Sequence, residues 1–231
     1  MTKNTKEVIE KSQLSDYDKK EALEYLKHGY ILFNKIPYYY KICDDHDDYY
    51  DDLYEDADPN YFLSKYIPLC NDEYSKQALI NEWAMYWKGE IVPYVKDVIN
   101  MGWKIKNPLP NIIYISNNQL KLIDGSSPIL FIACEYRISE LIEELLKNGA
   151  DPNVSFNYEN SLEWVINGHH ASYTDCERKS AYESLYECLL ILEKYGLKYN
   201  LYDEFDDNLS EFINKCPIPD LKKRLESIKF K

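Results

Sequence analysis

The sequence predicts an all-α fold, a stack of helix-turn-helix units with loop insertions and a helical N-terminal region. Three segments carry apolar residues at helical spacing and end at a glycine, namely Gly102, Gly149 and Gly196. Glycine adopts the left-handed conformation that commonly terminates a helix at the lowest cost. Two short helices cannot cover their apolar stripes alone, so we expect the pairs to stack against one another.

The central unit gives the clearest pattern. Ser127 and Pro128 open a short apolar helix, and a second helix carries Leu141, Ile142, Leu145 and Leu146 on one face. The second helix is followed by Gly-Ala-Asp-Pro-Asn over residues 149–153. This segment, 124–153, resembles the ankyrin repeat.

Two features depart from the ankyrin pattern. Pro128-Ile-Leu-Phe131 stands where the family has Thr-Pro-Leu-His, and Arg137 stands at the glycine of the inter-helix turn. The resemblance therefore implies a degenerate array. Its units are expected at about 73–107, 124–156 and 157–200, with a cap at 201–231. Residues 1–72 form a helical, Tyr/Asp-rich N-terminal region, for which a divergent capping repeat is one interpretation.

Composition narrows the classes of function. The formal net charge is −13, which disfavours a binder of the nucleic-acid backbone or of an anionic membrane surface and favours a basic partner. The 23 tyrosines suit a binding surface, although coding bias in an AT-rich genome would produce the same count. No secretory leader or membrane-length apolar stretch is apparent, so we expect a cytoplasmic protein.

The sequence offers no catalytic motif, cofactor fingerprint or zinc-type cysteine spacing, so a non-enzymatic protein without cofactor or metal is expected. The six cysteines are expected to be buried, reduced thiols. His169 and His170 are adjacent and therefore point apart, which favours a polar loop over a metal site. An enzymatic site before residue 75 remains a third hypothesis.

The acidic run 44–58 alternates aspartate with tyrosine. It lacks the glycine and closing glutamate of a calcium loop. A docking face for a basic protein and a solvated acidic surface both stay open.

The resemblance implies a protein–protein interaction module that binds through loop tips and the ends of first helices. The leading hypothesis is inhibition or sequestration of a basic partner such as a toxin or nuclease, as an immunity protein or antitoxin does. The alternative is a virus- or pathogen-encoded ankyrin effector or adaptor that engages host proteins. Trp164 is expected to be a core residue, and an exposed anchor is the alternative. The candidate partner-binding residues are Tyr114, Asn117, Asn118, Glu135, Tyr136, Phe156, Tyr158, Glu159, Tyr173, Tyr202, Glu204 and Phe205, together with Asp47, Asp48, Tyr49, Tyr50 and Asp51.

Overall fold

The structure is a computed structural model that describes residues 3–33, 59–70, 72–105, 109–123, 125, 127–156, 159–168, 175–201, 210 and 213–230. The chain forms two compact units. The first comprises Met1–Tyr86 and Pro108–Ser126, and the second comprises Trp87–Asn107 and Ser127–Lys231. The prediction of a mostly helical chain is confirmed, and three small sheets that the sequence did not predict accompany the helices.

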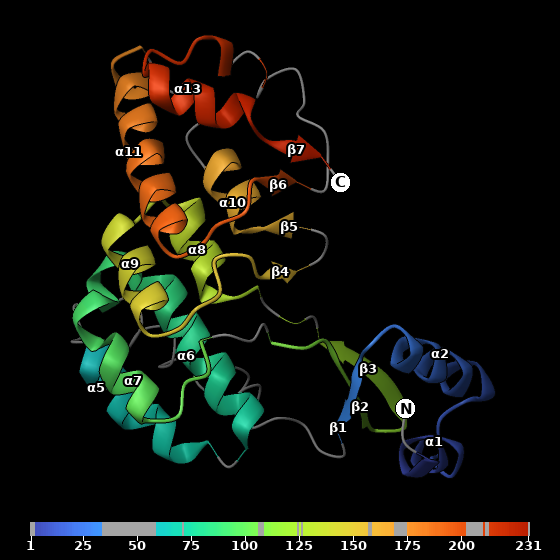
Figure 1. Cartoon of the computed structure of the whole chain (residues 1–231). Helices are drawn as coiled ribbons and strands as arrows, with labels where there is room; N and C mark the ends of the chain where they lie inside the picture. Colours follow the sequence, from blue (N-terminus) through green and yellow to red (C-terminus); the bar gives the residue numbers. More distant parts are fainter. Residues whose placement is uncertain are drawn as a thin grey trace. The chain divides into compact units, whose positions relative to one another are not determined.

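The first unit contains helices and a three-stranded sheet (Figure 1). Its elements are α1 (Lys3–Glu10), α2 (Asp16–Lys27), β1 (Ile31–Phe33), α5 (Pro59–Tyr66), η1 (Ile67–Leu69), α6 (Glu73–Trp87, whose last residue falls in the second unit), β2 (Ile112–Ser116) and β3 (Gln119–Ile123).

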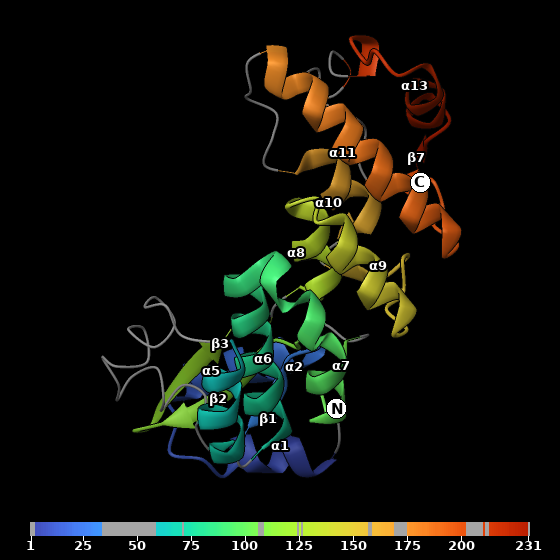
Figure 2. The same ribbon diagram turned by 90° about the vertical axis from the view of Figure 1, so that its left-hand side faces the viewer.

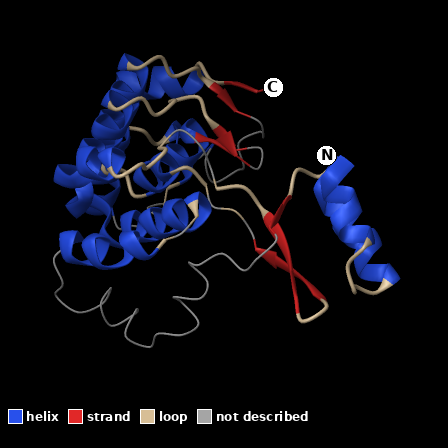
Figure 3. Cartoon of the chain, turned by 90° about the horizontal axis from the view of Figure 1, so that it is seen from below, coloured by secondary structure: helices blue, strands red, loops and turns tan. Residues whose placement is uncertain are grey.

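The sheet of this unit has the order β1-β2-β3, with β1 parallel and β3 antiparallel to β2 (Figure 3). Asn117 and Asn118 form its hairpin turn and both have positive φ, at 50° and 59°, the conformation a two-residue turn of this kind requires. Ile113 of β2 is fully buried against Ile9 of α1 and Ala22 of α2. Residues 108–123, which the sequence predicted to be a loop insertion, therefore contain a strand pair that packs in a core with α1 and α2.

The second unit contains the remaining elements: η2 (Lys88–Tyr94), α7 (Val95–Asn100), α8 (Ile129–Glu135), α9 (Ser139–Lys147), β4 (Ser155–Phe156), β5 (Glu159–Asn160), α10 (Ser161–Asn167), α11 (Asp175–Lys194), β6 (Asn200–Leu201), α13 (Pro219–Glu226) and β7 (Lys229–Phe230). β4 and β5 form an antiparallel hairpin, and β6 pairs in parallel with β7.

Helices of the second unit pack in pairs. α8 lies against α9 and α10, and α9 lies against η2 and α11, so that the two helix pairs α8–α9 and α10–α11 are adjacent (Figure 2). The contact surfaces are apolar and fully buried, at about 1.5–3 kcal/mol for each large side chain. They include Leu130, Phe131, Leu141, Leu145, Leu162, Val165, Leu185, Leu189 and Leu192.

Helix ends follow the sequence prediction. Gly102, Gly149 and Gly196 have φ of 105°, 96° and 92°, and each lies two residues beyond the last residue of α7, α9 or α11. The left-handed helix ends are thus confirmed. Within the described part of the chain, no helix has both the length and the apolar character needed to cross a bilayer.

Candidate partner-binding pocket

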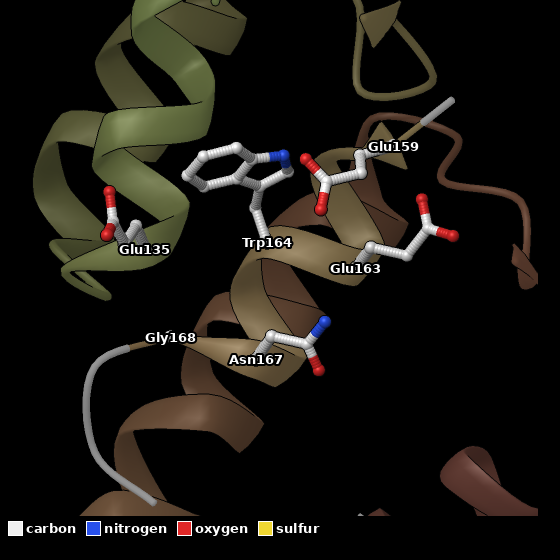
Figure 4. A pocket seen from close by; sticks show the side chains of 6 residues that line it. All are labelled: Glu135, Glu159, Glu163, Trp164, Asn167 and Gly168. Carbon is white, nitrogen blue, oxygen red and sulfur yellow. The ribbon is translucent and has the colours of Figure 1, made fainter. Parts of the chain in front are cut away.

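A pocket of about 170 Å³ opens in the second unit beside the hairpin β4–β5. Its walls come from three elements: the last residue of α8, strand β5, and one face of α10 with the glycine that follows it (Figure 4). The lining residues are Glu135, Glu159, Glu163, Trp164, Asn167 and Gly168. Three carboxylates and an indole ring therefore border one small cavity.

The first turn of α10 is fixed by a capping box. Asn160 Oδ1 accepts hydrogen bonds from the backbone N–H groups of Leu162 and Glu163, at 2.9 and 3.2 Å. Glu163 Oε2 in return accepts from the Asn160 N–H at 2.6 Å. Because both residues are at most 9% exposed, these reciprocal bonds hold the Glu163 carboxylate at the edge of the pocket. The negative charge also suits the positive end of the helix dipole.

Strand β5 brings Glu159 to the same place. Glu159 pairs with Phe156 across the hairpin β4–β5, and Asn160, the next residue, begins α10 as its N-cap. The side chain of Glu159 is exposed at the pocket rim. A short turn thus places two glutamates four positions apart on neighbouring sides of one cavity.

Trp164 forms the aromatic wall. Its ring stacks on fully buried Phe131 of α8, with centroids 5.4 Å apart and an interplanar angle of 27°. Figure 4 shows the indole projecting from α10 toward α8. Its Nε1 atom is buried and has no hydrogen-bond partner among the described residues. Trp164 lies between the two expected environments, core and exposed, because its ring packs on Phe131, is only partly buried and also borders the pocket.

Gly168 closes the base of the pocket by a close backbone approach. A Cβ atom at this position would lie 2.4 Å from the carbonyl oxygen of Glu135. No side chain fits at that distance, so the C-terminal ends of α8 and α10 can be adjacent only with glycine here.

Arg137 lies beside this junction, in the turn between α8 and α9. Its side chain is 7% exposed, and its guanidinium donates to the carbonyl oxygens of Val165, Ile166 and Ala181 at 3.0–3.1 Å. Its backbone φ is 49°, a left-handed value at the position where the ankyrin pattern has glycine. The side chain of Arg137 therefore cross-links two helices, α10 and α11.

The pocket lining combines acidic residues with an aromatic ring. Among the described residues, no group of three or more His, Cys, Asp or Glu side chains has the arrangement of a metal centre. Carboxylates attract an ammonium or guanidinium group, and an indole face adds a cation–π interaction of about 0.5–2 kcal/mol. A lysine or arginine side chain of another molecule combines the required charge with an apolar stem.

The structure brings only some of the predicted partner-binding residues to the pocket. Glu135 and Glu159 are brought together at the pocket, and Phe156 is half-buried in the adjoining strand β4. Tyr136 is half-buried at the end of α8, where the Nζ atom of Lys88 lies 3.7 Å from its ring centroid.

Three of the candidates, Tyr114, Asn117 and Asn118, belong to the first compact unit. Asn117 and Asn118 are exposed at the β2–β3 turn, whereas Tyr114 lies within strand β2 and is half-buried. The prediction that Tyr114 is at a loop tip is corrected, because its backbone pairs with Lys121 of β3 and with Phe33 of β1.

The other candidates lie outside the described residues. They are Tyr158, Tyr173, Tyr202, Glu204 and Phe205, together with Asp47, Asp48, Tyr49, Tyr50 and Asp51 of the acidic run. His169 and His170 also lie outside.

Four pocket residues were not predicted: Glu163, Trp164, Asn167 and Gly168. A local signal existed for one of them, because Asn160 followed three residues later by Glu163 is the spacing of a capping box. The remaining three depend on which face of α10 packs against α8, which is a tertiary property.

Two cysteines lie in the core next to this site. Cys134 of α8 and Cys188 of α11 are fully buried, free thiols. Burial raises the pKa of Cys188 to about 12 and places the pKa of Cys134 well above its ordinary value. Both are therefore inert packing residues at neutral pH, as predicted for them.

No family model, curated protein sequence or solved structure matches this chain.

Proposed function

We propose that this chain is a non-enzymatic protein–protein interaction module whose second unit binds a basic segment of a partner protein. The observation that carries the proposal is the pocket itself, whose lining combines Glu135, Glu159 and Glu163 from three elements with the partly buried Trp164. Such a cavity receives a single positively charged side chain and orients it against an aromatic wall.

The packing of the helix pairs supports an ankyrin-like array as the scaffold. First helices α8 and α10 pack together, second helices α9 and α11 pack together, and the hairpin β4–β5 precedes the first helix of the later pair. Asn153, the last residue of the Gly-Ala-Asp-Pro-Asn segment, bonds to the backbone at Gly196 and Lys198, where the next pair ends. The segment after α9 is thus hydrogen-bonded to the segment after α11, the corresponding position in the next helix pair.

Arginine is the proposed occupant. Its planar guanidinium has five N–H donors, which match carboxylates approaching from several directions, and it stacks on an indole better than an ammonium does. A net charge of −13 would draw a basic partner toward the chain before the pocket is engaged. Inhibition of a basic toxin or nuclease is the specific form of this function that we favour.

The experiment uses short neutral-flanked peptides with one central residue: acetyl-Gly-Gly-Arg-Gly-Gly-amide and its lysine and citrulline counterparts. Binding is followed through the indole ¹H–¹⁵N signal of Trp164, assigned with Trp164→Phe. We expect the arginine peptide to shift this signal saturably, the lysine peptide to bind more weakly, and the citrulline peptide to leave the signal unchanged.

A pair of matched variants locates the interaction. Glu159→Gln should weaken arginine binding about fivefold, because it removes one partly exposed charge interaction of roughly 1 kcal/mol. Glu226→Gln makes the same change of charge on exposed α13 and should leave the dissociation constant unaltered. Equal effects of the two variants, or equal binding of citrulline, would reject the pocket as the binding site.

A further inference from the structure

We propose that Arg137 is a positioning residue for this pocket: its guanidinium holds the C-terminal end of α10 so that Gly168 stays against Glu135. The inference rests on the proposed function only for its binding measurement, because the positioning itself can be observed in the free protein.

The hydrogen bonds of Arg137 reach distant parts of the second unit. Nε donates to Val165 O at 3.0 Å, Nη2 to Ile166 O at 3.1 Å, and Nη1 to Ala181 O in α11 at 3.1 Å. The acceptors are 28, 29 and 44 residues away in sequence. One planar group thus connects the α8–α9 turn to both helices of the following pair.

The acceptors on α10 are groups that need an external donor. The last four carbonyl groups of a helix have no partner within it, and Val165 and Ile166 are in the last turn of α10, which ends at Asn167. Gly168 then leaves the helix with φ −43° and ψ 155°. Arg137 supplies the missing donors at the point where the chain changes direction into the pocket base.

The position of Arg137 in its own turn links these bonds to the opposite wall. It is two residues after Glu135, whose carbonyl oxygen faces the Gly168 backbone. A displacement of the guanidinium would therefore move the end of α10 relative to Glu135, and the pocket would change shape without any change in its lining residues.

The backbone conformation of Arg137 indicates that its side chain is required at this position. A φ of 49° is unfavourable for arginine and easily adopted by glycine. Arginine in this conformation, with its guanidinium buried and bonded to three carbonyls, is explained by the side-chain contacts rather than by the turn.

The test uses two variants with opposite properties. Arg137→Gly removes the side chain and relaxes the backbone, so it should fold. Arg137→Lys keeps the charge but has one ammonium group in place of the planar fork, and it cannot reach three carbonyls on two helices. Arg224→Lys, the same replacement on α13, is the matched control.

The first measurement is made on the free proteins. In both Arg137 variants we expect a displaced indole signal of Trp164 and at least tenfold faster hydrogen exchange at the amides of residues 166–168. The amides of α13 give the reference for global unfolding. Arg224→Lys should leave the Trp164 signal and residues 166–168 as in the wild type.

The second measurement is the dissociation constant for the arginine peptide, at a temperature where all variants are fully folded. We expect at least a tenfold increase for both Arg137 variants. If they only lower the thermal midpoint and leave the Trp164 signal, the local exchange and the affinity unchanged, Arg137 is a structural residue and the inference is overturned. Wild-type behaviour of Arg137→Lys would also overturn it, because a charge would then suffice.

The two proposals fail separately. If the wild-type protein does not bind the arginine peptide, the proposed function fails, while the Trp164 signal and the exchange at residues 166–168 still decide the role of Arg137.

Discussion

Asn153 connects one helix pair to the next through a single side chain. Its Nδ2 donates to Gly196 O at 2.9 Å and its Oδ1 accepts from the Lys198 N–H at 2.7 Å. Both partners follow α11, whereas Asn153 follows α9. The amide satisfies a donor and an acceptor of the backbone at once, whereas the ionised carboxylate of aspartate, a side chain of similar size, has no donor.

Replacing this residue tests its contribution. Asn153→Ala should lower the free energy of unfolding by about 1–2 kcal/mol, because two hydrogen bonds to the backbone are lost. Asn100→Ala, at the exposed end of α7, should change it by less than about 0.5 kcal/mol. Urea denaturation followed by circular dichroism measures both, and equal values would show that Asn153 does not connect the pairs.

The buried cysteines give a chemical test of the core at the residue scale. Because burial raises the pKa of Cys188 to about 12 and that of Cys70 to about 11, little thiolate is present at pH 8. We expect Cys134 and Cys188 to resist iodoacetamide in the folded protein and to react fully in denaturant, as read by peptide mass mapping. Rapid labelling of the folded chain at these two positions would show that the core opens.

The helices of the second unit begin in different ways, and each beginning is a property of a single helix. α10 has a complete capping box, whereas α9 has no side-chain cap and depends on its buried leucines and Ile142. Left-handed glycines follow α7, α9 and α11, whereas α10 is followed by Gly168 with a φ of −43°.

The cost of losing such a helix end can be isolated at Gly196. An added Cβ would have no neighbour within 4 Å, so Gly196→Ala introduces only the backbone strain of φ 92°, about 1 kcal/mol of stability. Gly89→Ala provides the comparison, because φ is not positive there and the new methyl group would contact Ile138 at an ordinary 3.5 Å. Thermal unfolding should show a loss for the first variant alone.

The charge of the whole molecule predicts how binding depends on salt. With a net charge of −13, association with a basic protein should be accelerated at low ionic strength and slowed about tenfold or more between 20 and 500 mM NaCl. Stopped-flow fluorescence with a lysozyme-like basic protein as the probe and a neutral protein as the control measures this dependence. An association rate that does not respond to salt would remove electrostatic steering from the proposed function.

Much of the second unit could be predicted because its signals are local. The apolar stripe of α9, the glycine after it and the helix at 219–226 can each be recognised from a few consecutive residues. The strands around Asn117 and Asn118 were missed because short strands of apolar residues resemble buried helix segments in periodicity. Glu135 and Glu159 were predicted from the loops and helix ends of the ankyrin pattern, but their meeting at one cavity was not.

The sequence by itself determined that helices end at Gly102, Gly149 and Gly196, that α9 has an apolar face and that the chain is strongly acidic, since these depend on neighbouring residues and on composition. Only the tertiary structure decided that Trp164 borders a pocket, that Gly168 must be glycine, and that Arg137 cross-links helices far away in sequence. These features arise where elements distant along the chain come into contact, and the contact geometry depends on all of the packed side chains together.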